Sequence, residues 1–346
     1  VEMDARGYIV SCSYNFSASL ITIPEILDGI AVKGVADGVN YYNPGPFAMK
    51  KIVSVQFAPG IEYIGNLTFY NNLIIELDMP DSLKTVGSYG FSHNRMTSLE
   101  LPGSLVSIGT NSFYYNQITD ISLPASISDI GNGAFFGNPL PGFILPAPEQ
   151  EGFYDWIDNL GNSYAAGDSV ISAYLSLGFQ TRFAHTLTDD DVEVDTSGYI
   201  TSCIASASEK VYIIPDTLDG YEVKGIADAI SRYSGVFFSY YKDIYVFPPG
   251  LEHIGTYAFS DNYLRNIFTL PNSVISIGEN AFSYNYYLKG VVLPTPDVDG
   301  FVDWVDVNNG IAYEGSDTIT DFSVKYEARF AYVLTDEDVE VDANGY

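Results

Sequence analysis

The sequence predicts a repeat solenoid, mainly β, and the first observation behind this prediction is a fixed period of 22 residues. Four phenylalanines keep this period: Phe69, Phe91, Phe113 and Phe135. Three further series keep the same step: Gly65, Gly87, Gly109 and Gly131; Asn72, Asn94, Asn116 and Asn138; and Ile52, Ile74, Met96, Ile118 and Leu140. A constant step across independent residue types is typical of a solenoid, whose units bury their faces against their neighbours. The periodic residues are therefore expected to be structural, and function is expected in the positions that vary.

The second observation is the spacing of apolar residues inside each repeat. In residues 96–117, MTSLELPGSLVSIGTNSFYYNQ, Met96, Leu99 and Leu101 stand at i, i+3 and i+5. This is the L-x-x-L-x-L spacing of a leucine-rich repeat, and its last residues alternate between inward and outward as a strand requires. Pro102 lacks an N–H donor, so the strand is expected to end there at a corner.

The return from each strand is expected to contain corners with short helical or 3-10 turns. Gly109 is expected to permit a tight turn with positive φ. Phe113 is expected to be buried, and the side chain of Asn116 is expected to bond the backbone of its own turn. Two insertions, residues 38–51 and 229–243, lack the repeat pattern.

The motif as a whole resembles a known family of repeats. The string LP-x-S-L-x-x-I-G-x-x-x-F-x-x-N-x-I-x-x-I-x-LP is similar to the BspA-like leucine-rich repeats of bacterial surface proteins. A second block carries the same pattern at a 23-residue step, seen in Phe259 and Phe282. The resemblance implies leucine-rich repeats over most of residues 20–146 and 210–296. It also implies a secreted or cell-surface (extracellular) location and a role in adhesion.

The third observation is a larger duplication that contains the repeats. Residues 1–8 read VEMDARGY, residues 192–199 read VEVDTSGY, and residues 339–346 read VEVDANGY. Alternating apolar residues around a polar turn predict a hairpin that caps the start of each solenoid. We therefore expect solenoids over residues 1–148 and 191–296, and the start of a third unit at residues 337–346. The hypothesis that follows is a longer array of such units.

A different module closes each solenoid. Residues 152–183 and 300–330 share F-x-x-W, a glycine turn and a closing Y-x-A-x-F or its variant, with Trp156 equivalent to Trp304. The pattern is similar to the small Listeria–Bacteroides (InlB B-type) repeat, which implies β-grasp-like modules over residues 149–190 and 297–336. At about forty residues such a module is near the limit for independent folding. It is therefore expected to pack on the last repeat as a C-terminal cap.

Composition and motifs exclude several classes of function. The net charge of −29 argues against nucleic acid and against anionic membrane surfaces. No apolar run approaches the ~18 residues of a membrane span, so no direct membrane insertion is expected. The three histidines lie far apart in the sequence, and no hydrolase, zinc or phosphate-loop motif occurs. A non-enzymatic protein without a cofactor is therefore predicted.

The favoured binding site is the outward side of the repeat strands, taken to be the concave face. Residues between the inward positions point to solvent and would stack at strand spacing of about 4.8 Å. They form an acidic and hydroxyl-rich stripe: Ser54, Gln56, Glu76, Asp78, Ser98, Glu100, Asp120 and Ser122. A merely solvated face is the competing interpretation. The stripe predicts a protein ligand, and the resemblance implies that this ligand lies on a host or neighbouring cell.

Tyrosines in the corner turns and insertions are the alternative site. The 28 tyrosines include Tyr41, Tyr42, Tyr114, Tyr115, Tyr240 and Tyr241. Tyrosine offers contact area at low entropy cost together with a hydroxyl group, so a carbohydrate-binding module is a second functional class. Packing between corner loops is the structural explanation of the same residues. A structural spacer that binds nothing is the third class.

An acidic segment near residue 190 raises the question of calcium. Its carboxylates are Asp189, Asp191, Glu193 and Asp195. The loop lacks the bidentate glutamate that an EF-hand requires at its twelfth position. A solvated acidic linker is therefore the favoured interpretation, no metal site is predicted, and calcium remains the alternative.

Overall fold

The computed structural model describes residues 1–14, 20–205 and 208–331 of the 346-residue chain. The chain divides into two compact units, Val1–Arg182 and Phe183–Tyr346. Each unit has its own hydrophobic core. The fold is a β-solenoid, as the period predicts. The expected start of a third unit, residues 337–346, lies outside the described residues.

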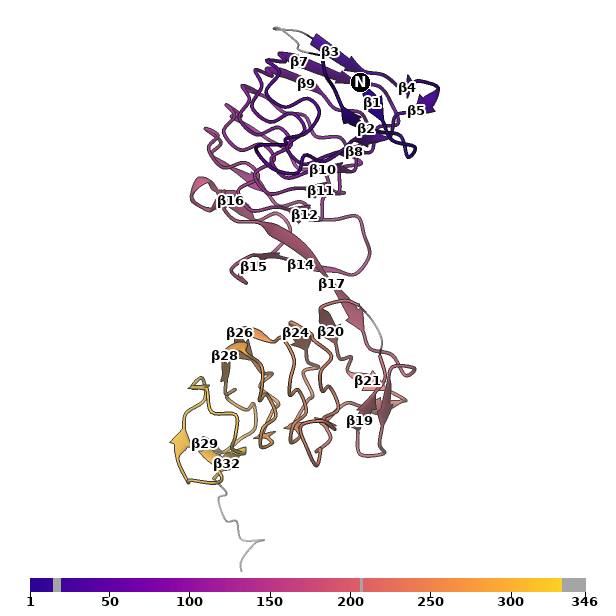
Figure 1. The fold of residues 1–346 in the computed structure, drawn as a ribbon. Helices are drawn as coiled ribbons and strands as arrows, with labels where there is room; N and C mark the ends of the chain where they lie inside the picture. Colours follow the sequence, from indigo (N-terminus) through magenta and orange to yellow (C-terminus); the bar gives the residue numbers. More distant parts are fainter. Residues whose placement is uncertain (15–19, 206–207, 332–346) are drawn as a thin grey trace, which may run out of the picture. The chain divides into compact units, whose positions relative to one another are not determined.

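The first parallel sheet of the first unit contains the strands predicted from the leucine spacing. It consists of β3 (Leu20–Ile23), β7 (Ser54–Phe57) and β9 (Glu76–Asp78), which pair in that order (Figure 1). Successive side chains alternate between the core and solvent, as in Val55 and Gln56. The same stretches of the next two coils lie outside regular strands but keep the alternation.

A second parallel sheet runs through the residues just before each repeat glycine. Its two-residue strands are β6 (Gly34–Val35), β8 (Tyr63–Ile64), β10 (Thr85–Val86), β11 (Ser107–Ile108) and β12 (Asp129–Ile130). The predicted hairpin, β1 (Glu2–Met3) and β2 (Tyr8–Ser11), joins this sheet by pairing with β6. A second small hairpin joins β4 (Ile26–Leu27) to β5 (Ile30–Ala31). These strands could not be predicted from the sequence, because two residues are too few to show a strand period.

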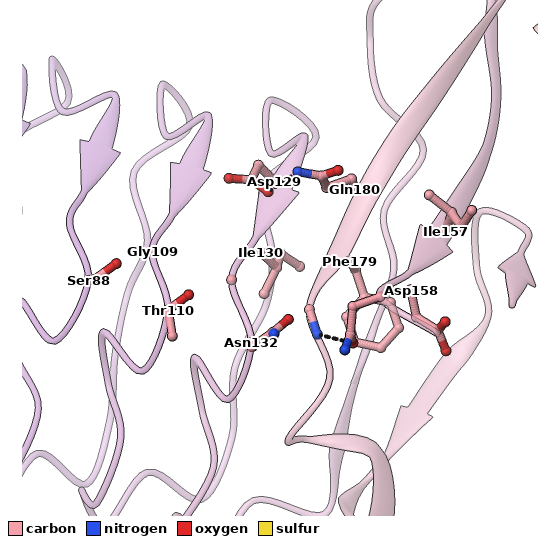
Figure 2. Close-up of a pocket in the computed structure, with 13 residues that line it drawn as sticks. Ser88, Gly109, Thr110, Asp129, Ile130, Asn132, Ile157, Asp158, Phe179 and Gln180 are labelled. Atoms are coloured by element: carbon pink, nitrogen blue, oxygen red, sulfur yellow. Dashed lines mark hydrogen bonds between the residues drawn. The ribbon is translucent and has the colours of Figure 1, made fainter. Parts of the chain in front are cut away.

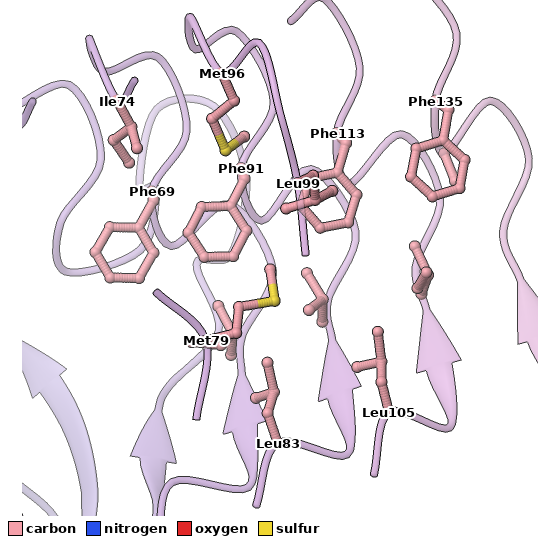
Figure 3. Packing of buried hydrophobic residues seen from close by; sticks show 14 of the residues in the cluster. Phe69, Ile74, Met79, Leu83, Phe91, Met96, Leu99, Leu105, Phe113 and Phe135 are labelled. Atoms are coloured by element: carbon pink, nitrogen blue, oxygen red, sulfur yellow. The ribbon is translucent and has the colours of Figure 1, made fainter. Parts of the chain in front are cut away.

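A ladder of phenylalanine rings fills the core between the two sheets. Rings of Phe69, Phe91, Phe113 and Phe135 stack nearly parallel, with centroids 5.1–5.8 Å apart (Figure 3). Phe47 continues the ladder, with its ring centroid 5.3 Å from that of Phe69. The expectation that residues 38–51 lack the repeat pattern is therefore wrong in part. The step of 22 residues from Phe47 to Phe69 was the available signal.

The repeat glycines are required by close contact between coils. A Cβ on Gly109 would lie 2.5 Å from the backbone nitrogen of Ser88. The φ angle of Gly109 does not lie in the positive range. The prediction of a positive-φ turn at this glycine was wrong. Positive φ occurs instead at non-glycine corners such as Tyr89 (φ 56°) and His93 (φ 57°). Short coil-to-coil spacing leaves no room for a side chain at the glycine.

Each repeat asparagine joins two coils. The Asn94 Nδ2 donates to the Phe91 carbonyl of its own coil at 2.9 Å and to the Phe69 carbonyl of the preceding coil at 3.0 Å. Its Oδ1 accepts from the Ile74 amide at 3.0 Å. The expected bond to the asparagine's own turn is thus present, and bonds to the neighbouring coil are added to it.

The corners are tight non-helical turns. Among the described residues, the structure has a single helix, the 3-10 helix η1 (Ser172–Tyr174), which lies in the first closing module. The short helical turns expected inside the repeats are therefore not found in the described coils. No described helix reaches the length and hydropathy that a membrane crossing requires.

The first closing module packs on the last repeat as a cap. Its β17 (Phe179–Thr186) pairs antiparallel with β12, placing Phe179 opposite Ile130. Trp156 is buried, and its indole N–H donates to the Pro146 carbonyl at 2.9 Å. The other strands are β13 (Gly142–Ile144), β14 (Phe153–Asp158), β15 (Ser163–Tyr164) and β16 (Ser169–Ile171). The predicted cap is confirmed, whereas the β-grasp-like likeness stays a prediction.

The second unit repeats this plan with fewer coils. Its short-strand sheet contains β18 (Val192–Val194), β19 (Tyr199–Cys203), β23 (Gly225–Ile226), β25 (His253–Ile254) and β27 (Ser276–Ile277). Its longer strands are β20 (Val211–Ile213), β24 (Ile244–Val246), β26 (Arg265–Thr269) and β28 (Tyr287–Val292). A hairpin joins β21 (Thr217–Leu218) to β22 (Tyr221–Glu222). The cap contains β29 (Phe301–Asp306), β30 (Ala312–Tyr313), β31 (Thr318–Ile319) and β32 (Tyr326–Phe330).

Candidate functional site

The residues predicted for the binding stripe do lie on one side of the first unit, here called the acidic face. Seven of the eight are exposed, and Ser54 is half-buried. Strand pairing sets Ser54 opposite Glu76 and Gln56 opposite Asp78. The alternation of buried and exposed residues continues to Asp120 and Ser122. The acidic face is therefore a continuous strip across four successive coils.

The carboxylates of the acidic face are available to a ligand. In the part of the chain that the structure describes, the side chains of Glu76, Asp78, Glu100 and Asp120 form neither hydrogen bonds nor ion pairs. Four unpaired negative charges on one face repel one another at short range and attract a basic partner.

Two shallow depressions lie between the coils of the acidic face. One, of about 450 Å³, is lined by Glu76, Asp78 and Glu100 together with apolar side chains such as Leu101. The other, of about 530 Å³, is lined by Glu100, Asp120, Ser98 and Ser122. The carboxylates therefore border hollows in which a partner's side chains can lie.

A further groove, which sequence reasoning missed, lies where the cap meets the last coils. It has a volume of about 410 Å³, and its walls include Thr110, Asn132 and Asp158 (Figure 2). Across it, the Gln180 amide donates to Asp129 at 3.1 Å. The lining is polar because glycines expose backbone there, among them Gly131 and Gly178. The carboxylate oxygens of Asp129 and Asp158 already accept hydrogen bonds within the protein, so they have fewer free lone pairs to offer a ligand.

The corner tyrosines of the first unit form one aromatic cluster. The Tyr41 ring lies 5.4 Å from that of Tyr70, and the Tyr70 ring lies 5.3 Å from that of His93. His93 in turn contacts Tyr114 and Tyr115, at 5.5 and 5.4 Å between ring centroids. Burial lowers the pKa of His93, so its neutral form is favoured within this cluster.

The remaining candidate tyrosines are divided between the two units, with Tyr42 in the first and Tyr240 and Tyr241 in the second. Tyr42 is 99% exposed. Tyr240 donates its hydroxyl proton to the Cys203 carbonyl, and its ring lies 6.0 Å from that of Tyr212, so it is a packing residue. Burial, followed by the effect of Cys203, raises the pKa of Tyr240. Tyr241 contacts Tyr263 at 5.2 Å between ring centroids.

The acidic segment near residue 190 does not gather its carboxylates around a common point. Asp191 accepts bonds from Thr188 and His185, and Asp195 caps a turn by accepting the Ser197 and Tyr199 amides. Glu193 accepts from a serine of β19, and Asp189 accepts from a backbone amide thirty residues away. Over the described residues, no group of three or more potential ligands could hold a metal ion. The geometry matches turn-capping in a linker and does not support the calcium alternative.

Comparisons with known proteins identify the repeats. A family model described as the BspA type leucine rich repeat region matches in six copies over residues 42–151 and 233–299, more than half of the chain. The matched ranges take in most of both insertions and leave out most of the closing modules. Among curated proteins no sequence matches the chain.

Several solved bacterial structures are also similar. A leucine-rich repeat protein from Bacteroides ovatus is 18% identical, with a TM-score of 0.30, over 80% of this chain and 57% of that protein. The pneumococcal vaccine antigen PcpA is 18% identical, with a TM-score of 0.30, over 82% of this chain and 74% of that one. A leucine rich cell surface protein from Faecalibacterium prausnitzii is 17% identical, with a TM-score of 0.25, over 85% of this chain and 87% of that protein. The chain thus spans little more than half the length of the Bacteroides ovatus protein.

Proposed function

Since this chain belongs to the BspA-type leucine-rich repeat family, we propose that it is a non-enzymatic, secreted or surface-attached protein that binds another protein. The proposed binding surface is the acidic face of the first unit, and the proposed partner is a protein with a basic patch on a host or neighbouring cell. Repeat solenoids offer extended surfaces on which a partner spans several coils at once.

The observation that carries this proposal is the set of unpaired carboxylates on the acidic face. All four are exposed. Glu100 borders both hollows, Glu76 and Asp78 border one of them, and Asp120 borders the other. Negative charge gathered in this way speeds association with a basic partner. Since the charges are exposed, the effect must weaken as salt rises.

The test is a charge-removing variant with four changes, Glu76→Gln, Asp78→Asn, Glu100→Gln and Asp120→Asn. Partners are isolated from host or neighbouring-cell surfaces by pull-down, and association is followed by surface plasmon resonance at several salt concentrations. The variant is expected to associate at least tenfold more slowly and to lose most of the salt dependence. Its thermal stability is expected to hold or rise, because repulsion across the face is removed.

A matched control removes the same charge from elsewhere in the first unit. The changes Glu25→Gln, Asp28→Asn, Glu149→Gln and Glu151→Gln alter four exposed carboxylates that lie outside the acidic face. This control is expected to keep most of the association rate. Equal slowing in both variants would show that net charge alone acts, and an unchanged rate in the face variant would refute the acidic face.

A carbohydrate ligand is the second candidate, and the aromatic cluster of the first unit favours it. Tyr115 and His93 are exposed and in contact with Tyr114, and aromatic rings on a surface supply contact area at low entropy cost. A glycan array separates the two classes. Glycan binding that is lost in Tyr115→Ala but kept in the four-carboxylate variant would move the site to the aromatic cluster, while no binding in either assay would favour a spacer.

A further inference from the structure

Backbone amides without a partner border the groove between the first cap and the last coils. In the part of the chain that the structure describes, the amide N–H groups of Thr110 and Asn132 make no hydrogen bond, and both residues line the groove (Figure 2). Each of the two residues directly follows a repeat glycine. A backbone donor that the protein leaves unpaired must be satisfied by water or by a ligand.

The amide at the same repeat position is paired in the earlier coils. The Asn66 amide donates to the Asp37 Oδ1 of the preceding coil at 2.7 Å, and the Ser88 amide donates to the Asn66 Oδ1 at 2.6 Å. In the second unit, the Thr256 amide donates to the Asp228 Oδ1 at 2.7 Å. A side-chain oxygen of the preceding coil therefore caps this amide wherever an aspartate or asparagine stands there.

The groove lies where this series of caps stops. The residues one coil before Thr110 and Asn132 are Ser88 and Thr110, which carry a hydroxyl in place of a carboxylate or an amide. Among the described residues, neither hydroxyl takes part in a hydrogen bond. The position that a capping oxygen takes in the earlier coils is therefore open to an oxygen of a ligand.

The unsatisfied groups of the groove are neutral, and they include both donors and acceptors. The side-chain amide of Asn132 is exposed and has no hydrogen-bond partner within the described ranges. From the described residues, in contrast, the carboxylate of Asp129 accepts two hydrogen bonds and that of Asp158 accepts four. The groups that remain suit a neutral polar ligand that both donates and accepts.

The groove offers little apolar surface to the side chains of a peptide. Its large apolar side chains are Ile130, Ile157 and Phe179, and Ile130 and Phe179 are only 2% and 1% exposed. A peptide ligand derives its selectivity from pockets for its side chains. A hydroxyl group donates and accepts through one atom, so the hydroxyl groups of a sugar match the free groups of this groove better.

We propose that this groove binds a neutral sugar residue of a glycan, whose oxygens accept hydrogen bonds from the Thr110 and Asn132 amides. One such oxygen would take the place that the Asn66 Oδ1 takes for the Ser88 amide. The groove volume of about 410 Å³ lies in the range of small-molecule sites. The site is separate from the acidic face and from the aromatic cluster around His93.

The test begins with binding of the full chain to a glycan array. The neutral disaccharide that binds best is then titrated by NMR, and the amide exchange of Thr110 and Asn132 is followed with and without it. Binding of neutral glycans, with slowed exchange of both amides, is the expected result. A chain that binds no neutral glycan would overturn the proposal, and so would a bound disaccharide that leaves both exchange rates unchanged.

A substitution that adds the missing cap makes the test specific to the groove. Ser88→Asn copies Asn66, so its Oδ1 is expected to pair with the Thr110 amide. The disaccharide should then bind about tenfold more weakly, because it loses hydrogen bonds in the groove. The melting temperature is expected to hold or rise, because a backbone donor gains a partner. Thr256→Asn is the matched control at the equivalent corner of the second unit, and its binding is expected to be unchanged.

Two further variants distinguish the groove from the other candidate surface. Asn132→Ala removes the exposed side-chain amide without adding atoms, and weaker binding is expected. Tyr115→Ala, in the aromatic cluster, is expected to bind the disaccharide as the wild type does. Wild-type affinity in folded Ser88→Asn and Asn132→Ala proteins would refute the groove, and a loss of binding confined to Tyr115→Ala would place the sugar on the aromatic cluster instead.

Discussion

The two solenoids share their inward residues and differ in their outward ones. In the first unit the outward strand positions are acidic or hydroxylated, as in Glu76 and Asp78. The equivalent positions of β26 are Ile267, which is 56% exposed, and Thr269. The same coil can therefore present charged or uncharged outward residues, because packing constrains only the inward half of each strand.

The shared inward half is built in the same way in both units. Phe237, Phe259 and Phe282 stack at 5.1 and 5.6 Å between ring centroids. Asn262 donates to the carbonyls of Phe237 and Phe259, as Asn94 does in the first unit. Substitutions in the phenylalanine ladder should therefore destabilise the two units equally. Substitutions at positions where the units differ should destabilise them unequally.

The largest loss of stability is expected when a ring is removed from the middle of a phenylalanine ladder. Phe113→Ala and Phe259→Ala each remove a side chain that is fully buried between two stacked neighbours. Each change is expected to cost about 3–5 kcal/mol, the range for truncating a buried aromatic residue. Denaturant titration measures the cost. A large loss in one unit and a small one in the other would break the equivalence of the two ladders.

The ladder and the strand orientation could be predicted because they repeat. A period seen in four residue types identified Phe113 as inward and Glu100 as outward, and the structure agrees. Phe47 was missed because its own repeat is interrupted around it. The reason for Gly109 was missed because contact between neighbouring coils leaves no local pattern in a single repeat.

The candidate sites were only partly predictable for a similar reason. Strand alternation gives the side to which Asp120 points, but not the hollows between coils. The contacts of His93 with Tyr114 and Tyr115 depend on corners with positive φ, which residue types other than glycine rarely adopt. The groove beside Gln180 depends on how the cap meets the last coil, which no repeat pattern encodes.

The next largest loss of stability is expected when an ion pair is removed from one of the two caps. Arg182 and Asp155 form a bidentate pair in which the arginine side chain is 4% exposed, whereas the Arg329 side chain, paired with Asp303, is 53% exposed. Arg182 also donates to Ser163 at 2.8 Å. Arg182→Met is expected to cost about 3 kcal/mol, because it leaves a buried carboxylate without its partner.

The matched change in the second cap is Arg329→Met. Solvent screens an exposed pair, so only a small fall in melting temperature is expected. Calorimetry of the two variants makes the comparison. If both changes lowered the melting temperature equally, burial would not be what distinguishes the two caps.

A smaller effect is expected from the glycines that allow coils to approach. Gly109→Ala places a Cβ 2.5 Å from the Ser88 amide nitrogen, and Gly278→Ala places one 2.3 Å from the Thr256 nitrogen. Each is expected to destabilise its unit by about 1–3 kcal/mol, the range for overpacking. Gly103→Ala is the control, because nothing lies within 4 Å of its added Cβ. Chemical denaturation should leave this control unchanged, and a comparable loss there would refute the close-contact explanation.

The smallest expected effect on stability is a pH dependence that distinguishes two lysines, one in each unit. The Lys50 and Lys242 amides both donate to a ladder asparagine, but Lys242 is buried and its ammonium lies 3.9 Å from the centre of the Tyr212 ring. Burial, and then the charge of Lys210, lowers the pKa of Lys242 from 10.5 to about 8. The folded state therefore disfavours the protonated form. That cost is fully present below pH 8 and disappears as the pH rises towards the ordinary value of 10.5.

Lys242→Met is thus expected to raise the stability of the second unit near pH 7, and its advantage over wild type should shrink by pH 9.5. Lys50→Met is the control, since Lys50 is only half-buried and its ammonium donates to the Tyr14 carbonyl. Urea titrations at pH 7 and 9.5 give the two differences. The direction in which this stability difference changes with pH is the test. If the advantage of Lys242→Met grew with pH, the folded unit would favour the charged lysine, through its contacts with Tyr212 and the Glu209 carbonyl.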